Sequence, residues 1–396
     1  MNVLILDGNQ NQAVASVRSL DRAGHTVFAG ESSSWSKSGW SRSCAGSVRY
    51  PSPHKDVAGF IESIVAFVHQ RPGILVLPMT EATTLPLSTY RDKLIAAGAR
   101  LVLPAHEDLI RAFDKEQTTQ LAASLGIAIP TTVRVNTSEE ARSTAKDLQY
   151  PVVLKPRASE ELTSGMIRAA GGPLYARDAT EFEHAYRDIS GRSSAVLVQQ
   201  FIPGEGTGYF ALMRHGELRA EFAHQRIRDV RPTGSGSAVR ISVEPDHEVR
   251  RSSLAMLSAL HWHGVAMVEY RQKAGSQPVF MEVNGRFWHS LALACYAGVD
   301  FPALLAEMAE NGDVQPNHGY QHGVRCRWLL GDVRHLIEVW KGPPPSYPGR
   351  YPGRLQTLRD VLTPVPGTYH DLFQWTDPLP ELADWMYLFS RMLKGR

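Results

Sequence analysis

A short stretch of the chain carries two carboxylates, an amide and a guanidinium that could together bind a metal ion and an anion: Glu269, Glu282, Asn284 and Arg286. Two apolar runs flank a polar segment with Gly275-Ser276 at its middle, which predicts two antiparallel strands joined by a turn. A turn centred there places Glu269 directly opposite Glu282. Because side chains alternate between the faces of a strand, Glu282, Asn284 and Arg286 share one face.

This group of side chains indicates a particular class of metal ion. Carboxylates that face each other across a sheet repel, and a cation between them removes the repulsion. Glu269, Glu282 and Asn284 offer only oxygen ligands, which suits magnesium or manganese bridging phosphates rather than zinc. Arg286 could neutralise an anionic substrate or a phosphoryl group. A solvated sheet face with ordinary surface charges is the alternative, and other segments must decide.

Other cationic side chains occur on predicted strands. Lys155 ends an apolar strand, where a lysine needs a partner or an anionic ligand unless it reaches solvent. Arg226 and Arg228 alternate where the strand predicted at residues 217–227 ends, and a loop of small residues follows them up to residue 237. The arginines and the free amides of the loop could form an anion cradle. A flexible, solvated loop is the competing interpretation.

A possible hinge follows the strand predicted at residues 195–202, which contains Gln199, Gln200 and Ile202. This strand ends in Pro203-Gly204-Glu205-Gly206. Such a glycine-rich elbow can act as a hinge between two lobes, and its exposed backbone can pair with the edge of an adenine ring.

The composition of the chain bounds its class. Its 396 residues are 43% hydrophobic and 21% charged, which is typical of a globular protein of two or three domains. The formal net charge of +2, without a strongly basic run, argues against a nucleic-acid partner. Three widely spaced cysteines match neither a disulfide framework nor a zinc site. With no signal-peptide pattern and no apolar run of membrane-spanning length, we expect a cytoplasmic protein without a transmembrane segment.

We expect an α/β chain of three parts. Residues 1–105 alternate strands, including one at 101–103, with periodic segments, which is typical of a doubly wound, Rossmann-like domain. Residues 106–312 form the second part, in which Lys115 lies at the start of a predicted helix. Residues 313–396 are rich in proline and tryptophan, and we expect an irregular, extended segment there. The amphipathic end of the chain, from residue 380, would pack on its own domain or on a second subunit, with membrane-surface binding as the alternative.

Lys115, Lys155, the hinge at Gln199 and the hairpin of Glu269 and Glu282 follow one another in the order and approximate spacing of the ATP-grasp superfamily. The chain most resembles the carboxylate-amine ligase branch, and the resemblance covers about residues 107–311. It implies an ATP-grasp domain at residues 106–312, with ATP between two lobes, after the Rossmann-like domain. Two positions differ from the common family pattern: the hinge has Gln-Gln where a glutamate is frequent, and Gly285 replaces the proline of Asn-Pro-Arg.

The resemblance implies roles for individual residues. Lys115 and Lys155 would contact the phosphates of ATP, and Arg286 would steady the reacting carboxyl or phosphoryl group. The other implied contacts are adenine at Gln199, Gln200 and Ile202, ribose at Glu205, and magnesium (or manganese) at Glu269, Glu282 and Asn284. From their own positions, Arg226 and Arg228 remain candidates for binding an anionic substrate.

By this resemblance, a small carboxylate such as an amino acid attacks the γ-phosphate of ATP, and an amine captures the resulting acyl phosphate as an amide. This chemistry needs no protein nucleophile, and no GxSxG motif occurs in the chain. The alternatives are a phosphotransferase, a thioester-forming ligase, or a sensor that binds the nucleotide without turnover. A homodimer is possible.

Overall fold

A parallel sheet forms the N-terminal part of the protein. The computed structural model describes residues 1–193, 195–273, 275–317 and 319–393. The strands of this sheet run parallel in the order β3-β2-β1-β4: β1 (Asn2–Ile5), β2 (Thr26–Glu31), β3 (Gly46–Arg49) and β4 (Leu75–Leu77). Its helices are α1 (Asn11–Arg22), α2 (Val57–His69), α3 (Glu81–Thr89) and α4 (Arg91–Ala96). The strand predicted at residues 101–103 does not form, and the adjacent Arg100 makes only an isolated bridge with Leu75.

Helices cover both faces of this sheet. Val3 and Ile5 of β1 share a core cluster with α1, whereas Leu4 belongs to the cluster that contains α2. Strands buried on both faces read as continuous apolar runs, which is why β1 and β4 were visible in the sequence.

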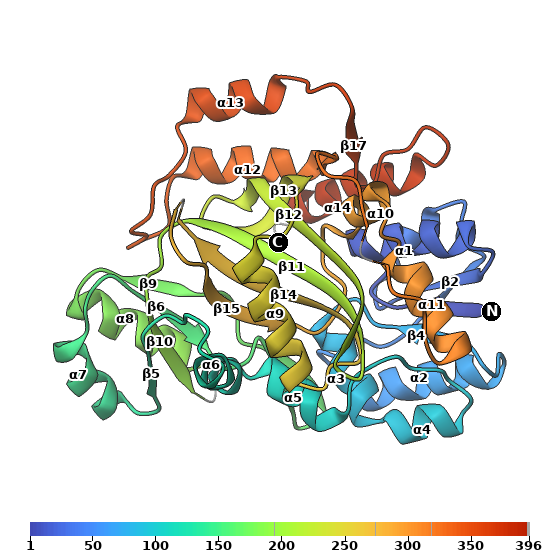
Figure 1. Ribbon diagram of the computed structural model, residues 1–396, viewed down its shortest axis with the longest axis horizontal. Coiled ribbons are helices and arrows are strands. Elements are labelled where there is room, and N and C mark those ends of the chain that lie inside the picture. The colour runs from blue at the N-terminus through green and yellow to red at the C-terminus, as the bar shows by residue number, and fades with distance from the viewer. Residues whose placement is uncertain (194, 274, 318, 394–396) are drawn as a thin grey trace.

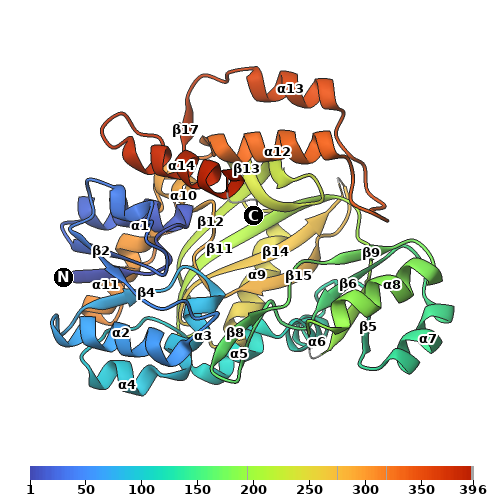
Figure 2. The same cartoon turned by 180° about the vertical axis from the view of Figure 1, so that it is seen from behind.

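A small antiparallel sheet forms a separate lobe. It contains β5 (Thr132–Val135), β10 (Val196–Gln200), β6 (Val152–Pro156) and β9 (Leu174–Ala176), in that order. Two helices, α7 (Ser138–Asp147) and α8 (Ala179–Ser190), contribute to its hydrophobic core. In sequence, a hairpin of β7 (Glu160–Thr163) and β8 (Met166–Ala169) comes between β6 and β9. Helix α6 (Lys115–Ser124) comes before β5. This lobe stands at the lower left of Figure 1 and the lower right of Figure 2.

A seven-stranded sheet occupies the centre of the molecule (Figure 1), in the order β15-β14-β11-β12-β13-β16-β17. All neighbouring strands are antiparallel except β16 and β17. The bounds are β11 (Glu205–Arg214), β12 (Glu217–Arg231), β13 (Ser235–Ser242), β14 (Gly264–Gln272), β15 (Val279–Asn284), β16 (Arg325–Arg327) and β17 (Thr368–His370). Its helices include α9 (His247–Ala259), α10 (Leu291–Ala297) and α11 (Phe301–Asn311).

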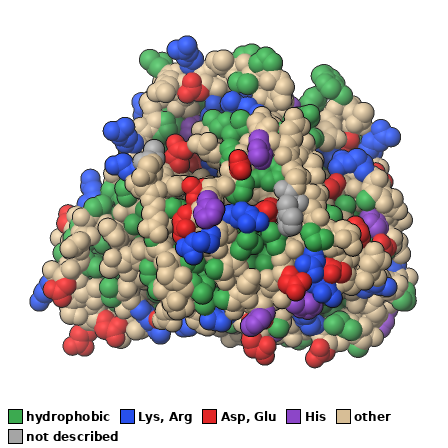
Figure 3. Space-filling view, viewed as in Figure 1, with side chains coloured by type: hydrophobic (Ala, Val, Ile, Leu, Met, Phe, Trp, Pro, Cys, Tyr) green, Lys and Arg blue, Asp and Glu red, His purple; other side chains and the backbone are tan. Residues whose placement is uncertain are grey.

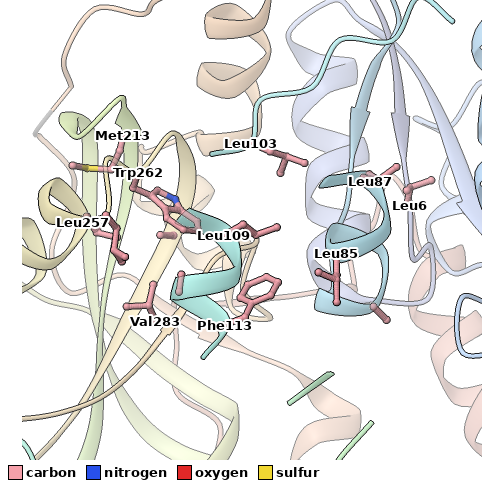
Figure 4. Packing of buried hydrophobic residues seen from close by; sticks show 14 of the residues in the cluster. Leu6, Leu85, Leu87, Leu103, Leu109, Phe113, Met213, Leu257, Trp262 and Val283 are labelled. Carbon is pink, nitrogen blue, oxygen red and sulfur yellow. The ribbon is translucent and has the colours of Figure 1, made fainter. Parts of the chain in front are cut away.

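One helix connects the N-terminal part to the central sheet. Leu109 and Phe113 of α5 (His106–Phe113) point toward Trp262 and Val283 on one side (Figure 4). Leu85 of α3 lies on the other side of the same cluster. Because large apolar side chains from both parts share one core, their burial stabilises the two parts together.

The C-terminal segment is regular, so the prediction of an irregular extension is wrong. It contains α12 (Leu329–Lys341), α13 (Arg354–Leu362) and α14 (Leu379–Leu393), and its strands β16 and β17 extend the central sheet. Nine of its ten prolines lie outside these helices and strands, and the tenth, Pro380, is the second residue of α14. Proline interrupts a helix only in the interior, so a proline-rich composition here marks the connections.

Two surface features complete the description. On the face seen in Figure 3, basic and acidic side chains are interspersed. Among the described residues no single helix is long and apolar enough to cross a membrane, although α10 and α11, bent by 85° at their junction, pass that test as a pair by length and composition.

Candidate active site

The predicted hairpin forms, and a β-bulge between Glu269 and Tyr270 shifts its register by one residue on the side of the turn. β14 pairs with β15 so that Glu269 lies opposite Glu282 and Met267 lies opposite Asn284. Asn284 therefore extends the same face of the sheet by one row. The sequence prediction that two carboxylates face each other across this sheet is confirmed.

This face borders a cavity of about 1200 Å³ between the small lobe and the central sheet. Both lobes and the C-terminal segment contribute to its walls. The sequence-predicted residues that line it are Lys115, Lys155, Gln199, Gln200, Ile202, Arg226, Glu269, Glu282, Asn284 and Arg286. A cavity of this size between two lobes suits a ligand as large as a nucleotide.

The carboxylate of Glu282 makes only long contacts with its neighbours in the protein. Glu282 Oε2 lies 3.7 Å from Lys115 Nζ, and Asn284 Nδ2 donates to Glu282 Oε1 over 3.4 Å. Burial alone would raise the pKa of Glu282, but Lys115 and Lys155 outweigh it and hold the pKa below its usual value. Within the described ranges no group of three or more His, Cys, Asp or Glu could hold a metal ion, so any metal here would rest on two carboxylates and an amide.

The two lysines approach this hairpin from the small-lobe side. Lys115 Nζ donates to Ser159 Oγ over 2.8 Å, next to its contact with Glu282. Burial lowers the pKa of Lys155, and the carboxylate of Glu282 opposes that effect. The lysines and Glu282 thus form a cluster with excess positive charge, which favours an anionic ligand.

The arginines on the hairpin side are held in place by the proposed metal ligands. Arg286 Nη2 donates to Asn284 Oδ1 over 2.9 Å, and Arg226 forms an ion pair with Glu269. Arg226 reaches Glu269 across β11 because Gly206 has no side chain there: a Cβ at Gly206 would lie 2.8 Å from Arg226 Nη1. Glycine at this position leaves room for the guanidinium.

Arg228 is directed away from the cavity, so the prediction that it shares a face with Arg226 is wrong. Arg226 pairs with Arg240 and Arg228 pairs with Val239, so two residue steps on β12 match one on β13. This β-bulge inverts the alternation of side chains. Arg228 therefore lies outside the set of residues that line the cavity, and it forms an ion pair with Asp332.

The predicted small-residue loop is also shorter than expected. β12 continues to Arg231 and β13 begins at Ser235, so residues 232–234 form the turn. Arg231, Thr233 and Gly234 still line the cavity.

The hinge residues divide into two groups. Gln199, Gln200 and Ile202 line the cavity, and Gln199 Oε1 is a buried acceptor that has no hydrogen-bond partner among the described residues. Glu205 is exposed, accepts a hydrogen bond from Gln225 Nε2 over 3.1 Å, and is absent from the lining.

Several lining residues were not identified from the sequence as site residues. Arg271 bridges two segments, because its guanidinium donates to the backbone oxygens of Gly204 and Thr233. Glu338 and Lys341 at the end of α12, with Pro343 beyond it, form a wall of the cavity. Arg271 lies close enough to Glu269 in sequence to have been found, but no local pattern signals the contribution of α12.

His289 also lines the cavity, next to Trp288, His224 and Ser290. Burial lowers the pKa of His289 to about 4, so its imidazole is neutral at pH 7. His224 Nε2 shares a hydrogen bond of 2.7 Å with Ser290 Oγ. This end of the cavity is therefore lined by neutral polar groups and an indole, in contrast to the cationic end at the lysines.

Comparison with known proteins gives matches to a family model and to enzymes of known activity. A family model described as "ATP-grasp in the biosynthetic pathway with Ter operon" matches residues 192–331. A D-alanine–D-alanine ligase of Stutzerimonas stutzeri (strain A1501) is 28% identical over 215 residues, which cover 50% of this chain and 65% of the relative. The N-terminal section of a carbamoyl phosphate synthase large chain from Methanopyrus kandleri is 26% identical over 216 residues, 51% of this chain and 36% of the relative. The chain thus spans less than two thirds of either relative.

Solved structures share the fold at low sequence identity. An L-amino acid ligase from Bacillus licheniformis has a TM-score of 0.60 and 17% identity, covering 78% of this chain and 74% of that chain. An N5-carboxyaminoimidazole ribonucleotide synthetase from Thermus thermophilus has a TM-score of 0.62 and 15% identity, covering 92% and 99%. The cavity between two lobes, the carboxylate hairpin and these similarities lead to one conclusion: residues 192–331 belong to an ATP-grasp domain, and the chain is similar to carboxylate-amine ligases of that superfamily.

Proposed function

We propose that this protein is an ADP-forming ligase that joins a small carboxylate, such as an amino acid, to an amine through an acyl phosphate. The observation that carries the proposal is the placement of Glu269 opposite Glu282, with Asn284 in the next row, on a cavity that Lys115 and Lys155 also line. Two carboxylates and an amide on one cavity face supply oxygen ligands for a divalent cation, which a protein that only binds a nucleotide does not need.

The residues present fit ATP and a divalent cation. Glu282, whose lowered pKa keeps it ionised, with Glu269 and Asn284 forms the all-oxygen ligand set that magnesium or manganese prefers. Lys115 and Lys155 would bind the phosphates. Gln199 Oε1, a buried acceptor lacking a partner in the described part of the chain, suits the amino group of adenine, with Gln200 and Ile202 beside it.

The chain itself would act by positioning and by neutralising charge. When bound, the divalent cation would supply charge compensation for the phosphate oxygens. Lys115, Lys155 and Arg286 would stabilise negative charge as an oxygen of the substrate carboxylate bonds to the γ-phosphorus and the bond to ADP breaks. The amine nitrogen would then bond to the acyl carbon, releasing inorganic phosphate and one proton. None of these steps requires a covalent bond to the protein.

We also propose roles for the rest of the chain. Residues 1–105 would be a Rossmann-like domain, residues 106–312 the ATP-grasp domain and residues 313–396 a C-terminal extension that forms part of the cavity wall. Arg226 would bind an anionic group of the substrate, since it lines the cavity beside Glu269. The biotin carboxylase domain of the Hydrogenobacter thermophilus 2-oxoglutarate carboxylase, which is similar in fold, forms a dimer, and this supports testing for a homodimer here.

The test is ADP release with magnesium and ATP against a panel of amino acids and other carboxylic acids, alone and with amines, followed by mass spectrometry. We expect ADP formation to require two substrates and to yield a product lighter by one water than their sum. Phosphorylation of a hydroxyl would instead indicate a phosphotransferase, and formation of a thioester would indicate a thioester-forming ligase. Measurable ATP binding without ADP formation under any condition would support a sensor instead.

A further inference from the structure

A second, smaller pocket lies away from the ATP-grasp cavity, beside strands β13, β16 and β17. Its volume is about 160 Å³. Its lining combines three arginines with one carboxylate, one histidine and small or apolar residues: Arg228, Arg325, Arg327, Asp360, His370, Val239, Thr363, Pro364, Val365 and Thr368. The two pockets have no lining residue in common.

The strand register explains why the arginines converge. Arg327 pairs with Val239 on one side and with His370 on the other, and Arg325 pairs with Thr368. Directly paired residues project to the same side of a sheet, and residues two apart on a strand share a face. The bulge that directs Arg228 away from the ATP-grasp cavity pairs it with Val239, and so adds a third guanidinium to this row.

Only part of this positive charge is compensated. The carboxylate of Asp332, whose side chain is 1% exposed, accepts one hydrogen bond from Arg228 and another from Arg327, so both of its oxygens are used. Arg228 Nη2 and Arg327 Nη2 each donate over 2.8 Å to a carbonyl near the end of α13, those of Asp360 and Val361.

Arg325 is the guanidinium without compensation. Over the described ranges it has no ion pair and no side-chain hydrogen bond, and Asp360, the acidic residue of the lining, is exposed. Burial lowers the pKa of Arg325, and the charges of Arg228 and Arg327 lower it further, with Asp332 opposing them. The pKa of His370 is also lowered by burial, so its ring adds a neutral polar group. A half-buried cation among like charges is stabilised by an anion.

We propose that this pocket is a binding site for a small oxyanion, a phosphate or carboxylate group, with Arg325 as its principal ligand. A guanidinium presents a planar set of donors that matches both groups. A water molecule occupies roughly 30 Å³ in the liquid. A pocket of about 160 Å³ therefore has room for a phosphate or carboxylate group but not for a nucleotide. The site is separate from the proposed ligase chemistry and does not depend on it.

The test uses inorganic phosphate, the full-length protein, and a buffer of low ionic strength without phosphate or sulfate. Calorimetric titration of the wild type should detect phosphate, but the lysines of the ATP-grasp cavity could also bind it. We therefore compare Lys155→Met with Arg325→Gln, each against Arg350→Gln, which removes the same charge from an exposed arginine. Binding at the proposed site should survive Lys155→Met and Arg350→Gln, and weaken roughly tenfold to hundredfold in Arg325→Gln, the loss expected for hydrogen bonds to a charged group.

Thermal unfolding provides a second measurement, in which the loss of a charged residue is not expected to lower the unfolding temperature. Without phosphate, Arg325→Gln should unfold at the same temperature as the wild type or higher, because it removes an uncompensated charge. With phosphate, its unfolding temperature should rise less than that of Arg350→Gln, which controls for the general stabilisation by phosphate salts. Arg325→Lys keeps the charge without the planar donors and should bind with intermediate affinity.

Competition by acetate distinguishes the two sources of the oxyanion: displacement of phosphate would indicate a carboxylate-compatible site, and its absence a phosphate site. Equal phosphate affinity in Arg325→Gln and Arg350→Gln would overturn the proposal, as would a complete loss of phosphate binding in Lys155→Met.

Discussion

At the scale of single residues, the carboxylate pair on the hairpin is the feature whose chemistry can be tested most directly. Glu282 is surrounded by Lys115, Lys155 and Asn284, so its negative charge has two cations nearby even without a metal ion. Replacing it by glutamine keeps the size and the hydrogen-bonding capacity but removes the charge. The substitution therefore separates a metal-binding role from a purely structural one.

Glu282→Gln should reduce the ADP-forming rate at least about a hundredfold, since removal of one electrostatic contact to a reacting centre typically costs that much. Its unfolding temperature should change little, although the lysines lose a partner. The control is Glu307→Gln, an exposed glutamate on α11. Full activity in Glu282→Gln, measured by coupled ADP release over a range of magnesium concentrations, would rule out the metal assignment.

At the scale of elements, two glycines of β11 leave room for side chains of the neighbouring strands, and one of them, Gly206, lines the ATP-grasp cavity. Gly206 lies between Arg226 and Arg271, and Gly208 lies between His224 and Glu269. A side chain at Gly206 would occupy the space that Arg226 crosses to reach Glu269, whereas a Cβ at Gly208 would lie 2.9 Å from Met267 Cε and from Phe210 Cζ. The position of Arg226 therefore depends on the absence of a side chain at residue 206.

Gly206→Ala should displace the guanidinium of Arg226, because the new Cβ would lie 2.8 Å from Arg226 Nη1. The obstructing atom is the end of a flexible side chain, so the fold should persist while turnover falls. Gly191→Ala, where the nearest atom is 3.9 Å from the new Cβ, is the matched control. Kinetics with unchanged kcat and KM for both variants would show that the position of Arg226 does not matter for the reaction.

Helix α14 contains a buried glutamate that should make stability depend on pH. Burial raises the pKa of Glu381 to about 7. A 2.7 Å hydrogen bond from Trp385 Nε1 acts in the opposite direction and lowers the pKa. Because the folded-state pKa lies above that of the unfolded chain, the stabilising contribution is complete below about pH 4.5 and is lost as pH rises through about 7.

Glu381→Gln should remove this dependence, since the amide oxygen can still accept from Trp385 and carries no charge. We expect the variant to be more stable than the wild type at pH 8 and similar at pH 5, by urea unfolding at both values. Glu307→Gln should follow the wild type at each pH. An equal loss of stability with pH in Glu381→Gln and the wild type would contradict the assignment.

At the scale of the whole molecule, the C-terminal segment connects the two sides of the cavity. The segment of residues 342–351 leaves α12 and reaches the small lobe, as Figures 1 and 2 both show beside β9. There the ring of Tyr347 lies 5.1 Å from that of Tyr175 and 6.2 Å from that of Phe201, both in edge-to-face orientation. Tyr351 fixes the other end through a 2.9 Å hydrogen bond to the backbone oxygen of Glu338.

Tyr347→Ala should release the small lobe from this segment, because aromatic pairs of this geometry contribute about 0.5–1.5 kcal/mol beyond the area that they bury. Hydrogen exchange in β9 and α8 should quicken, and the KM for ATP should rise severalfold with a smaller effect on kcat. Tyr369→Ala, an exposed tyrosine on β17, controls for the loss of a ring elsewhere. Unchanged exchange in the small lobe would show that the contact does not restrain it.

The parts of the fold and of the site that the sequence predicted are those that depend on contacts between residues close in sequence. The pairing of Glu269 with Glu282 was predictable because the two strands of a hairpin are close in sequence, although the bulge beside Glu269 was not visible in the sequence. The strands around Lys155 and Gln199 were visible as short apolar runs, because both are buried within a sheet.

Only the tertiary structure determined where the arginines and the C-terminal segment lie. Alternation predicted one face for Arg226 and Arg228, but a bulge depends on how β12 pairs with β13, and nothing local in β12 signals it. Likewise the prolines after residue 342 indicated irregular chain, whereas Trp385 and Leu388 of α14 pack against a core cluster that contains Leu330, and this long-range burial stabilises the helix. The sequence alone therefore determined the chemistry of the hairpin, while long-range packing decided which cations share its cavity and which form a second pocket.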